Sequence, residues 1–317
     1  MATYFATVAR GLEAIAAEEL EELGATQLEP GFCGVEFQGD LALLYRVNLW
    51  ARLPFRILQQ IATLPCRNAT ELYQGIQTVD WSQYLTPDQT LAVKATGKTS
   101  ELNHTHFTAV QVKTAITDQQ QQDWGDRSDV DTKLPDLRVN VHLHQGQAVV
   151  SLDSSGDSLH RRGYRPAVGQ APLKESLAAA LIYLSDWQPG QAFFDPMCGS
   201  GTLPIEAGLQ ATHTAPGRFR DQFGFETWLN FDADLWEQLL IAAIAAQTPQ
   251  LDQPIGGCDA DQGVIDQARS NAQRSGLGAA LQFAQIALED GAEIGRAIAM
   301  AQPGVVMCNP PYGARLG

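Results

Sequence analysis

Apolar and polar positions follow two different periods over the first 45 residues of the chain. An apolar run over 4–9 and an alternating run over 34–38 predict β-strands. Between them, apolar residues at helical spacing over 11–23 predict a helix with an acidic exposed face. With a further helix expected after the second strand, these elements indicate a small α+β region.

A second mixture of strands and helices follows and extends to about residue 156. Its last two strands are joined by His144-Gln145-Gly146, which is a turn sequence between alternating runs. The stretch 118–135 is rich in Gln, Asp and Ser and predicts an exposed loop. The elements expected here are strands over 53–64, 91–96, 137–143 and 147–152, and helices over 69–79 and 106–117.

After residue 156 the pattern changes to glycine-rich strand–turn–helix units. Strands that alternate with helices predict a parallel sheet, so we expect an α/β fold of the Rossmann-like type. A long insertion over 212–253 interrupts the alternation. The expected order is a helix over 173–184, a strand over 192–195, a helix over 203–209, a strand over 255–259, a helix over 262–274, a strand over 281–286, another helix, and a strand over 305–308.

Length and composition fit a globular protein with more than one domain. A chain of 317 residues exceeds the size at which a single hydrophobic core stops growing. Its apolar runs are shorter than the about 18 residues that a membrane span needs. The N-terminus lacks the basic and apolar regions of a secretory signal, so we expect a cytoplasmic protein without a membrane segment.

Cysteines and histidines indicate neither a disulfide framework nor a metal site. The five cysteines are scattered, odd in number and without a C-x-x-C pair, so we expect them to be reduced. The histidines include the pairs His104/His106 and His142/His144, but a third ligand is not evident near either pair. We therefore expect no bound metal.

The net charge of −15 counts against a nucleic-acid partner, because Lys and Arg supply most of the non-specific affinity for phosphate. The distribution of charge weakens this objection. Residues 43–118 hold seven basic and five acidic side chains, and residues 159–174 hold four basic side chains and no acid. Either group can contact phosphate, although a solvated surface explains many such clusters.

Residues 195–202, Asp-Pro-Met-Cys-Gly-Ser-Gly-Thr, lie where a predicted strand gives way to a helix. Glycines in this loop let the backbone approach a ligand closely, which is typical of a cofactor site. Taken alone, the loop fits a dinucleotide, a nucleotide or S-adenosylmethionine.

The acid at the end of the next predicted strand is Asp259, which lies 64 positions after Asp195. Dinucleotide-binding folds place this acid about 20 residues beyond the glycine-rich turn, so the spacing disfavours an ordinary dinucleotide unit. A carboxylate here can accept hydrogen bonds from both hydroxyls of a ribose. The competing interpretation is that Asp259 only caps the following helix.

Asn309-Pro310-Pro311-Tyr312 follows the last predicted strand and is the most specific motif of the chain. The two prolines remove two backbone donors and stiffen the turn. An exocyclic base amine is a poor nucleophile until its two hydrogens are bound by acceptors. The side-chain oxygen of Asn309 and the carbonyl of Pro310 can be these two acceptors. Tyr312 can stack on a base that has been turned out of its helix.

Cys308 precedes this motif and raises the alternative of attack on a cytosine ring by a thiolate. Alternation along the predicted strand places its side chain in the core instead. We therefore expect a structural role for Cys308.

Together these features resemble the THUMP-domain guanine-N2 methyltransferases, most closely the bacterial type that acts on large-subunit ribosomal RNA. The resemblance spans nearly the whole chain. It rests on the sequences at 105–107, 112–113, 151–153, 159–165, 171–175, 195–202, 205–207, 215–217, 223–225, Trp228 and 309–313.

The resemblance implies three regions and an RNA partner. They are a ferredoxin-like α+β region over 1–45, a THUMP RNA-binding domain over 46–156, and an S-adenosylmethionine-dependent class I methyltransferase domain over 157–317. The partner would be structured RNA, with ribosomal RNA as the first expectation. The candidate phosphate contacts are Lys94, Lys98, Lys113, Arg161 and Arg162.

The resemblance also implies which residues bind the cofactor. Residues 165–175 would cover its methionine end, and Asp259 would hold its ribose. Relatives carry an acid for the adenine amine where Ala287 stands here, with Glu289 and Asp290 as substitutes. The implied cofactor-binding residues are Arg165, Pro172, Leu173, Lys174, Glu175, Asp195, Pro196, Cys198, Gly199, Ser200, Gly201, Thr202, Asp259 and Ala260; the implied catalytic residues are Asn309, Pro310, Pro311 and Tyr312.

Sheets of this family continue with three more strands, so we expect the methyltransferase domain to be truncated after its fourth strand, at Gly317. Two other functions stay open. A DNA adenine-N6 methyltransferase would use the same motif, because the motif suits any exocyclic amine. An RNA-binding protein that lacks catalysis is the second.

Overall fold

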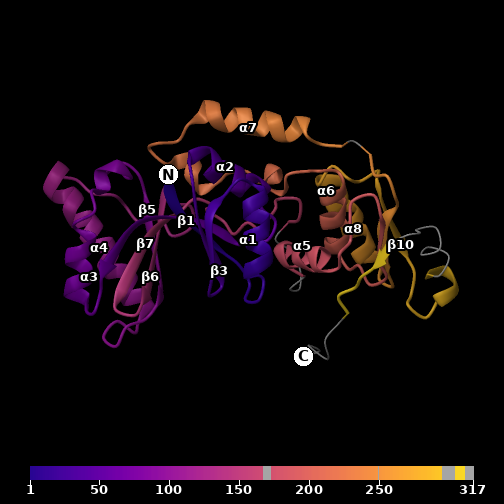
Figure 1. Ribbon diagram of the computed structural model, residues 1–317, viewed down its shortest axis with the longest axis horizontal. Helices are drawn as coiled ribbons and strands as arrows, with labels where there is room; N and C mark the ends of the chain where they lie inside the picture. Colours follow the sequence, from indigo (N-terminus) through magenta and orange to yellow (C-terminus); the bar gives the residue numbers. More distant parts are fainter. Residues whose placement is uncertain (167–172, 249, 295–303, 311–317) are drawn as a thin grey trace. The chain divides into compact units, whose positions relative to one another are not determined.

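The computed structural model describes residues 1–166, 173–248, 250–294 and 304–310 (Figure 1). The chain forms two compact units. Unit 1 comprises Met1–Asn48, Pro54–Ser158 and Gln222–Glu237, and unit 2 comprises Leu49–Leu53, Leu159–Asp221 and Gln238–Gly317.

Unit 1 is built on one seven-stranded sheet, in which only the neighbours β5 and β6 are parallel. Along the sheet the order is β2-β3-β1-β4-β7-β6-β5. The strands expected from the sequence are therefore confirmed, and β2 is an addition. The bounds are β1 (Ala2–Thr7), β2 (Thr26–Gly31), β3 (Gly34–Gly39), β4 (Arg56–Pro65), β5 (Leu91–Gly97), β6 (Leu137–His144) and β7 (Gln147–Asp153).

One face of this sheet continues across both regions of the unit and is mostly apolar. Tyr4 pairs with Phe37 and with Gln59, Gln59 pairs with Leu152, and Leu152 pairs with Val139, so these side chains share a face. The ferredoxin-like and THUMP regions thus join edge to edge into one sheet. The helices of the unit are α1 (Glu13–Glu22), α2 (Leu41–Trp50, which runs into unit 2), α3 (Ala69–Ile76), the short η1 (Trp81–Gln83) and α4 (Thr105–Trp124).

The loop expected over 118–135 begins later, because α4 continues to Trp124. The reason is that its glutamines are used inside the fold. The side chain of Gln119 donates to the carbonyls of Gln77 and Val79 and accepts from the amide of Trp81. A polar composition therefore did not indicate a solvated loop here.

Unit 2 contains a four-stranded parallel sheet in the order β10-β9-β8-β11, as expected for a Rossmann-like fold. Its strands are β8 (Ala192–Asp195), β9 (Ile255–Asp259), β10 (Leu281–Gln285) and β11 (Gly304–Val306). Its helices are α5 (Glu175–Leu184), α6 (Thr202–Ala211) and α8 (Gln262–Arg274); the insertion holds η2 (Pro216–Phe219), η3 (Gly224–Thr227) and α7 (Ala233–Ala245), which runs from unit 1 into unit 2.

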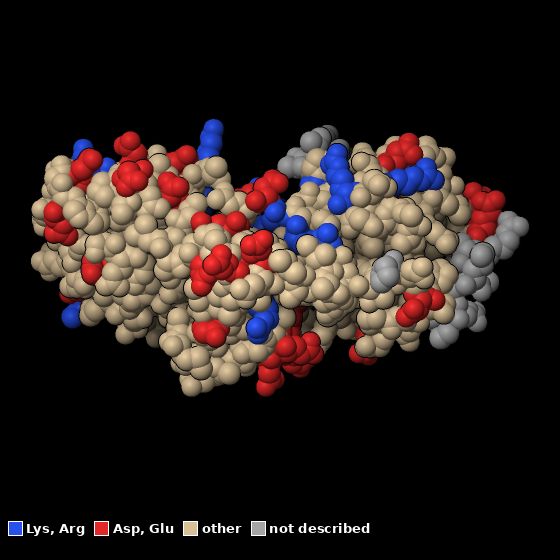
Figure 2. Space-filling view, turned by 90° about the horizontal axis from the view of Figure 1, so that it is seen from above, with Lys and Arg blue, Asp and Glu red and all other residues tan. Residues whose placement is uncertain are grey.

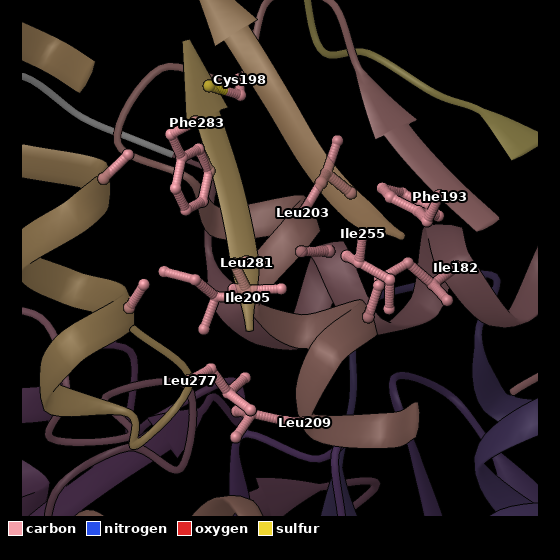
Figure 3. Packing of buried hydrophobic residues seen from close by; sticks show 14 of the residues in the cluster. Ile182, Phe193, Cys198, Leu203, Ile205, Leu209, Ile255, Leu277, Leu281 and Phe283 are labelled. Atoms are coloured by element: carbon pink, nitrogen blue, oxygen red, sulfur yellow. The ribbon is translucent and has the colours of Figure 1, made fainter. Parts of the chain in front are cut away.

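The core of unit 2 lies between α6 and the strands (Figure 3). Leu203, Ile205 and Leu209 of α6 pack with Ile255 of β9 and Phe283 of β10. This packing fixes the start of α6, and therefore the loop before it, against the ends of the strands.

The middle part of the insertion packs in unit 1. The rings of Tyr45 and Phe225 stack with their centroids 4.4 Å apart, and the amide of Asp232 donates to the hydroxyl of Tyr45. Residues 222–237 thus leave the region assigned to the methyltransferase domain.

The domain bounds at 45 and 156 stay predictions. Nothing in the described residues supports the expected truncation at Gly317. Within the described residues, every helix is too short or too polar to cross a membrane.

Candidate cofactor and catalytic site

The candidate site lies where the parallel strands of unit 2 end. Asp195 ends β8, Asp259 ends β9, and Asn309 follows β11 by three positions. The amide of Met307 donates to the carbonyl of Phe194 at 3.0 Å, so the segment after β11 continues alongside β8. Because carboxyl ends of parallel strands share one sheet edge, these three residues lie at the same edge of the sheet, which we take as the candidate site.

The glycine-rich loop is held closely against the end of β9. The amide of Cys198 donates to the carbonyl of Cys258 at 2.8 Å. A side chain at Gly257 does not fit, because its Cβ would lie 2.6 Å from the carbonyl oxygen of Asp195. At Gly199, by contrast, a Cβ would meet no described atom within 4 Å, so the loop presents open backbone there.

The Asp259 carboxylate organises this loop and does not cap the next helix. One oxygen accepts from the amide of Gly199 and the other from the amide of Asp261, both at 3.1 Å. The cap of α8 is Asp261, whose carboxylate accepts from the amides of Gly263 and Val264. The interpretation of Asp259 as a helix cap is therefore wrong. Asp259 is partly exposed, which leaves its oxygens accessible to further donors.

Asp195 is 2% exposed and accepts a hydrogen bond from the amide of Met197. Burial, with a smaller contribution from the charge of Asp259, raises the pKa of Asp195 to about 7. Asp195 therefore holds the loop from its buried side, whereas Asp259 lies on its solvent-accessible side.

Arg165 connects the segment before α5 with the start of α6. It forms an ion pair with Glu175 at 2.8 Å and donates to the hydroxyl of Thr202 at 3.1 Å and to the carbonyl of Leu173. Burial raises the pKa of Glu175, although the charge of Arg165 opposes this shift. The second oxygen of Glu175 is buried and has no hydrogen-bond partner among the described residues. A buried acceptor in this state is suited to a cationic or N–H donor of a ligand.

Arg162 was expected to contact RNA, and the structure corrects this expectation. Its side chain is 1% exposed, pairs with Glu206 of α6 at 3.4 Å, and donates to the carbonyls of Leu159 and Arg52. The hydroxyl of Tyr164 donates to the other oxygen of Glu206 at 3.1 Å. Sequence reasoning missed this network, although a single carboxylate in the apolar run 203–209 pointed to it.

The other expected phosphate contacts fall into separate places. Lys94 and Lys98 are exposed at β5 and just after it, Lys113 lies half-buried on α4, and Arg161 is exposed in unit 2. Lys94 lies on the sheet face opposite the apolar one, because its neighbours Val93 and Ala95 pair with Val139 and Val141. On the face drawn in Figure 2, basic side chains form small groups with acidic ones among them.

Cysteine chemistry is disfavoured at this site. Burial raises the pKa of Cys198 strongly and that of Cys258 to about 11, so both are neutral thiols near pH 7. Cys308 is exposed, contrary to the expected core position, because the alternation has the opposite phase: Val305 and Met307 pack against the core of unit 2, and Cys308 shares the exposed face of Val306.

Several expected site residues form the rim of the loop. Pro196, Gly199 and Ser200 are partly exposed, and Lys174 and Ala260 are exposed. Pro172, Pro311 and Tyr312 lie outside the described residues. Within the described ranges, no group of three or more His, Cys, Asp or Glu side chains could hold a metal ion.

The chain is similar to known families over three consecutive stretches. Residues 3–58 match the RlmL ferredoxin-like domain, residues 66–153 the THUMP domain, and residues 162–317 the RMKL-like methyltransferase domain.

Named relatives extend over almost the whole chain. A putative RNA methyltransferase from Synechocystis is 52% identical, covering 99% of this chain and 80% of the relative. The ribosomal RNA large subunit methyltransferase K/L of Methylococcus capsulatus is 44% identical over 99% of this chain, which spans only 42% of that relative.

Two solved structures share the fold at 33% identity, each matched over 99% of this chain and 81% of the other. One, from Listeria monocytogenes, is described as a predicted N6-adenine-specific DNA methylase and has a TM-score of 0.88. The other, SMU.472, is a putative methyltransferase complexed with SAH and has a TM-score of 0.85. With the three family matches and these relatives, the chain belongs to the THUMP-domain RNA methyltransferases with an RMKL-like methyltransferase domain.

Proposed function

We propose that this protein transfers a methyl group from S-adenosylmethionine to the exocyclic N2 amine of a guanine in large-subunit ribosomal RNA. One observation carries the proposal. The strand order β10-β9-β8-β11 gives Asp195, Asp259 and Asn309 a common sheet edge. The glycine-rich loop 195–202 at this edge would bind the cofactor, and the motif that begins at Asn309 would bind the amine of the base.

The residues at the edge fit S-adenosylmethionine. The buried, unpartnered oxygen of Glu175 suits the ammonium of the methionine end, and the partly exposed carboxylate of Asp259 suits ribose hydroxyls. The open backbone at Gly199 leaves room for a ligand beside the Asp259 carboxylate. The bound cofactor would supply an activated methyl group on its sulfonium. The relative SMU.472, a putative methyltransferase complexed with SAH, is consistent with this choice.

Asn309 and Pro310 are the groups that we assign to the base. The Asn309 side-chain oxygen and the Pro310 carbonyl would accept the two amine hydrogens and so localise the nitrogen lone pair toward the methyl group. Holding the amine in line supplies much of the acceleration, because it removes the orientational freedom of the reaction. A strong general base is then unnecessary. Tyr312 would stack on the base.

The RNA partner is supported by the THUMP match over 66–153 and by the names of the relatives. Lys94, Lys98, Lys113 and Arg161 remain the candidates for phosphate contacts. We expect the protein to act in the cytoplasm, where ribosomal RNA of a bacterium is found.

The test is methyl transfer from a labelled cofactor to unmodified 23S ribosomal RNA, transfer RNA and duplex DNA, followed by mass spectrometry of the nucleosides. We expect N2-methylguanosine from the ribosomal RNA. Label recovered as N6-methyladenine from duplex DNA would replace the proposal with the function that the Listeria relative's description names. RNA binding without transfer to any of the three substrates would favour a binding protein.

A further inference from the structure

The turn between β2 and β3 carries an unusually exposed aromatic ring. Phe32 is 80% exposed, so its ring contributes little to the free energy of folding. The guanidinium of Arg10 lies over this ring, 5.8 Å from its centroid. An arginine over an aromatic ring at this distance is a cation–π pair. The second face of the ring is available to a ligand.

Hydrogen bonds connect the turn before α1, which holds Arg10, to the turn between β2 and β3, which holds Phe32. The Glu13 carboxylate accepts from the amide of Gly11 at 2.7 Å and from the amide of Cys33 at 3.0 Å. The carbonyl of Cys33 also accepts from the amide of Val8. The turn that holds Arg10 and the turn that holds Phe32 are therefore fixed side by side by hydrogen bonds.

The backbone of the hairpin turn is constrained as well. Cys33 has a φ of 56°, a left-handed conformation that is unfavourable for a residue other than glycine. Gly34 cannot carry a side chain, because its Cβ would lie 2.6 Å from the carbonyl oxygen of Ala6. A two-residue turn between antiparallel strands requires such a conformation, so the turn geometry fixes where the Phe32 ring is presented.

We infer that Phe32 and Arg10 form a binding site for an unpaired nucleotide of the RNA. This inference rests on the proposed function, in which the substrate is RNA. A flat aromatic ring stacks on any base whose face is free, which a base inside a duplex does not offer. Arg10 adds a positive charge for the adjoining phosphate. In a protein with a net charge of −15, stacking also supplies affinity without requiring a continuous basic surface.

The experiment compares two RNA probes of equal stem sequence with the full chain. One is a blunt hairpin whose loop is replaced by a non-nucleotide linker, so that it has no unpaired base, and the other is the same hairpin with a single-stranded 3′ extension that contains 2-aminopurine. Phe32→Ala should weaken binding of the extended hairpin by about 5- to 150-fold, the effect of one lost stacked base. The same variant should leave the blunt hairpin and the dependence on salt unchanged. Phe32→Trp should restore the binding.

Arg10→Gln should act differently, because it removes a charge. The slope of log affinity against log salt for the extended hairpin should fall by about 0.7, the value for one phosphate contact on a single strand. Leu134→Ala removes another strongly exposed apolar side chain of unit 1, and Arg127→Gln another exposed charge. Both controls should match the unaltered protein.

The outcomes separate this inference from the function on which it rests. Binding of both probes by the unaltered protein, with no change in Phe32→Ala, overturns the nucleotide site alone and leaves the RNA substrate intact. An equal loss for both probes also overturns stacking on an unpaired base. If the unaltered protein binds neither probe, the RNA partner and this site fail together.

Discussion

The amide of Gly199 donates a hydrogen bond to the Asp259 carboxylate at 3.1 Å, which ties the glycine-rich loop after β8 to the end of β9. Asp259 therefore has two tasks in the proposed function. It positions the loop, and its accessible oxygens accept from the ribose. Asp261, only two positions on, is occupied with the cap of α8.

These neighbouring carboxylates give a matched pair of variants. Asp259→Ala should weaken S-adenosylhomocysteine binding by about 1.5–3 kcal/mol, the range for hydrogen bonds to a charged group. Asp261→Ala should leave this affinity nearly unchanged and lower the free energy of unfolding by about 0.5–2 kcal/mol, as expected for a lost helix cap. Titration calorimetry and urea unfolding measure the two effects. Equal ligand affinity in Asp259→Ala and the unaltered protein would remove Asp259 from the ribose site.

The buried Asp195 predicts a pH dependence of stability. Its pKa is about 7 in the folded protein against 3.8 as the ordinary value. Folding therefore favours the protonated form, and the unfolded chain binds fewer protons between these pH values. The favourable contribution is complete below about pH 3.8 and is lost as the pH rises through 7.

Asp195→Asn keeps an acceptor for the Met197 amide but cannot ionise. Its free energy of unfolding should exceed that of the unaltered protein at pH 8, and this difference should shrink toward pH 5. Urea unfolding at both pH values measures it. A difference that stays constant with pH would show that the carboxyl does not titrate in this range.

Arg161 and Arg162 are adjacent, but their side chains are in opposite environments. Arg162 is buried against Glu206, and Arg161 is exposed. Arg162→Met should lower the free energy of unfolding by about 3–5 kcal/mol, because it leaves a buried carboxylate without its partner. Arg161→Gln should change it by less than about 0.5 kcal/mol. Similar stabilities for the two variants, measured by urea unfolding, would contradict the buried pair.

The order of elements could be predicted from the sequence wherever the hydrophobic period was strong. Strand β9 and helix α8 have the expected bounds, Ile255–Asp259 and Gln262–Arg274. Strand β2 was missed because its side chains are almost all exposed, so no alternation marks it. Alternation of apolar and polar residues appears only where one face of a strand is buried, so an edge strand with both faces exposed shows no alternation.

Candidate site residues could be chosen by residue type from the sequence, but their surroundings could not be predicted. The loop at 195–202 and the acid at 259 could be recognised from local sequence and spacing. The fate of Arg162 depends on Glu206, which lies 44 positions away and becomes its partner only after folding. The same limit applies to Asp261, because a local sequence with two acids does not say which one caps α8.

The most direct test of the central claim measures methyl transfer to ribosomal RNA and cofactor binding in Asn309→Ala. The neighbouring substitution Cys308→Ala is the control. We expect Asn309→Ala to abolish methyl transfer while its Kd for S-adenosylhomocysteine stays within about threefold, because Asn309 acts on the amine and not on the cofactor. Cys308→Ala should retain transfer. Retained transfer in Asn309→Ala, or its loss in Cys308→Ala, would contradict an amine-directed reaction at this motif.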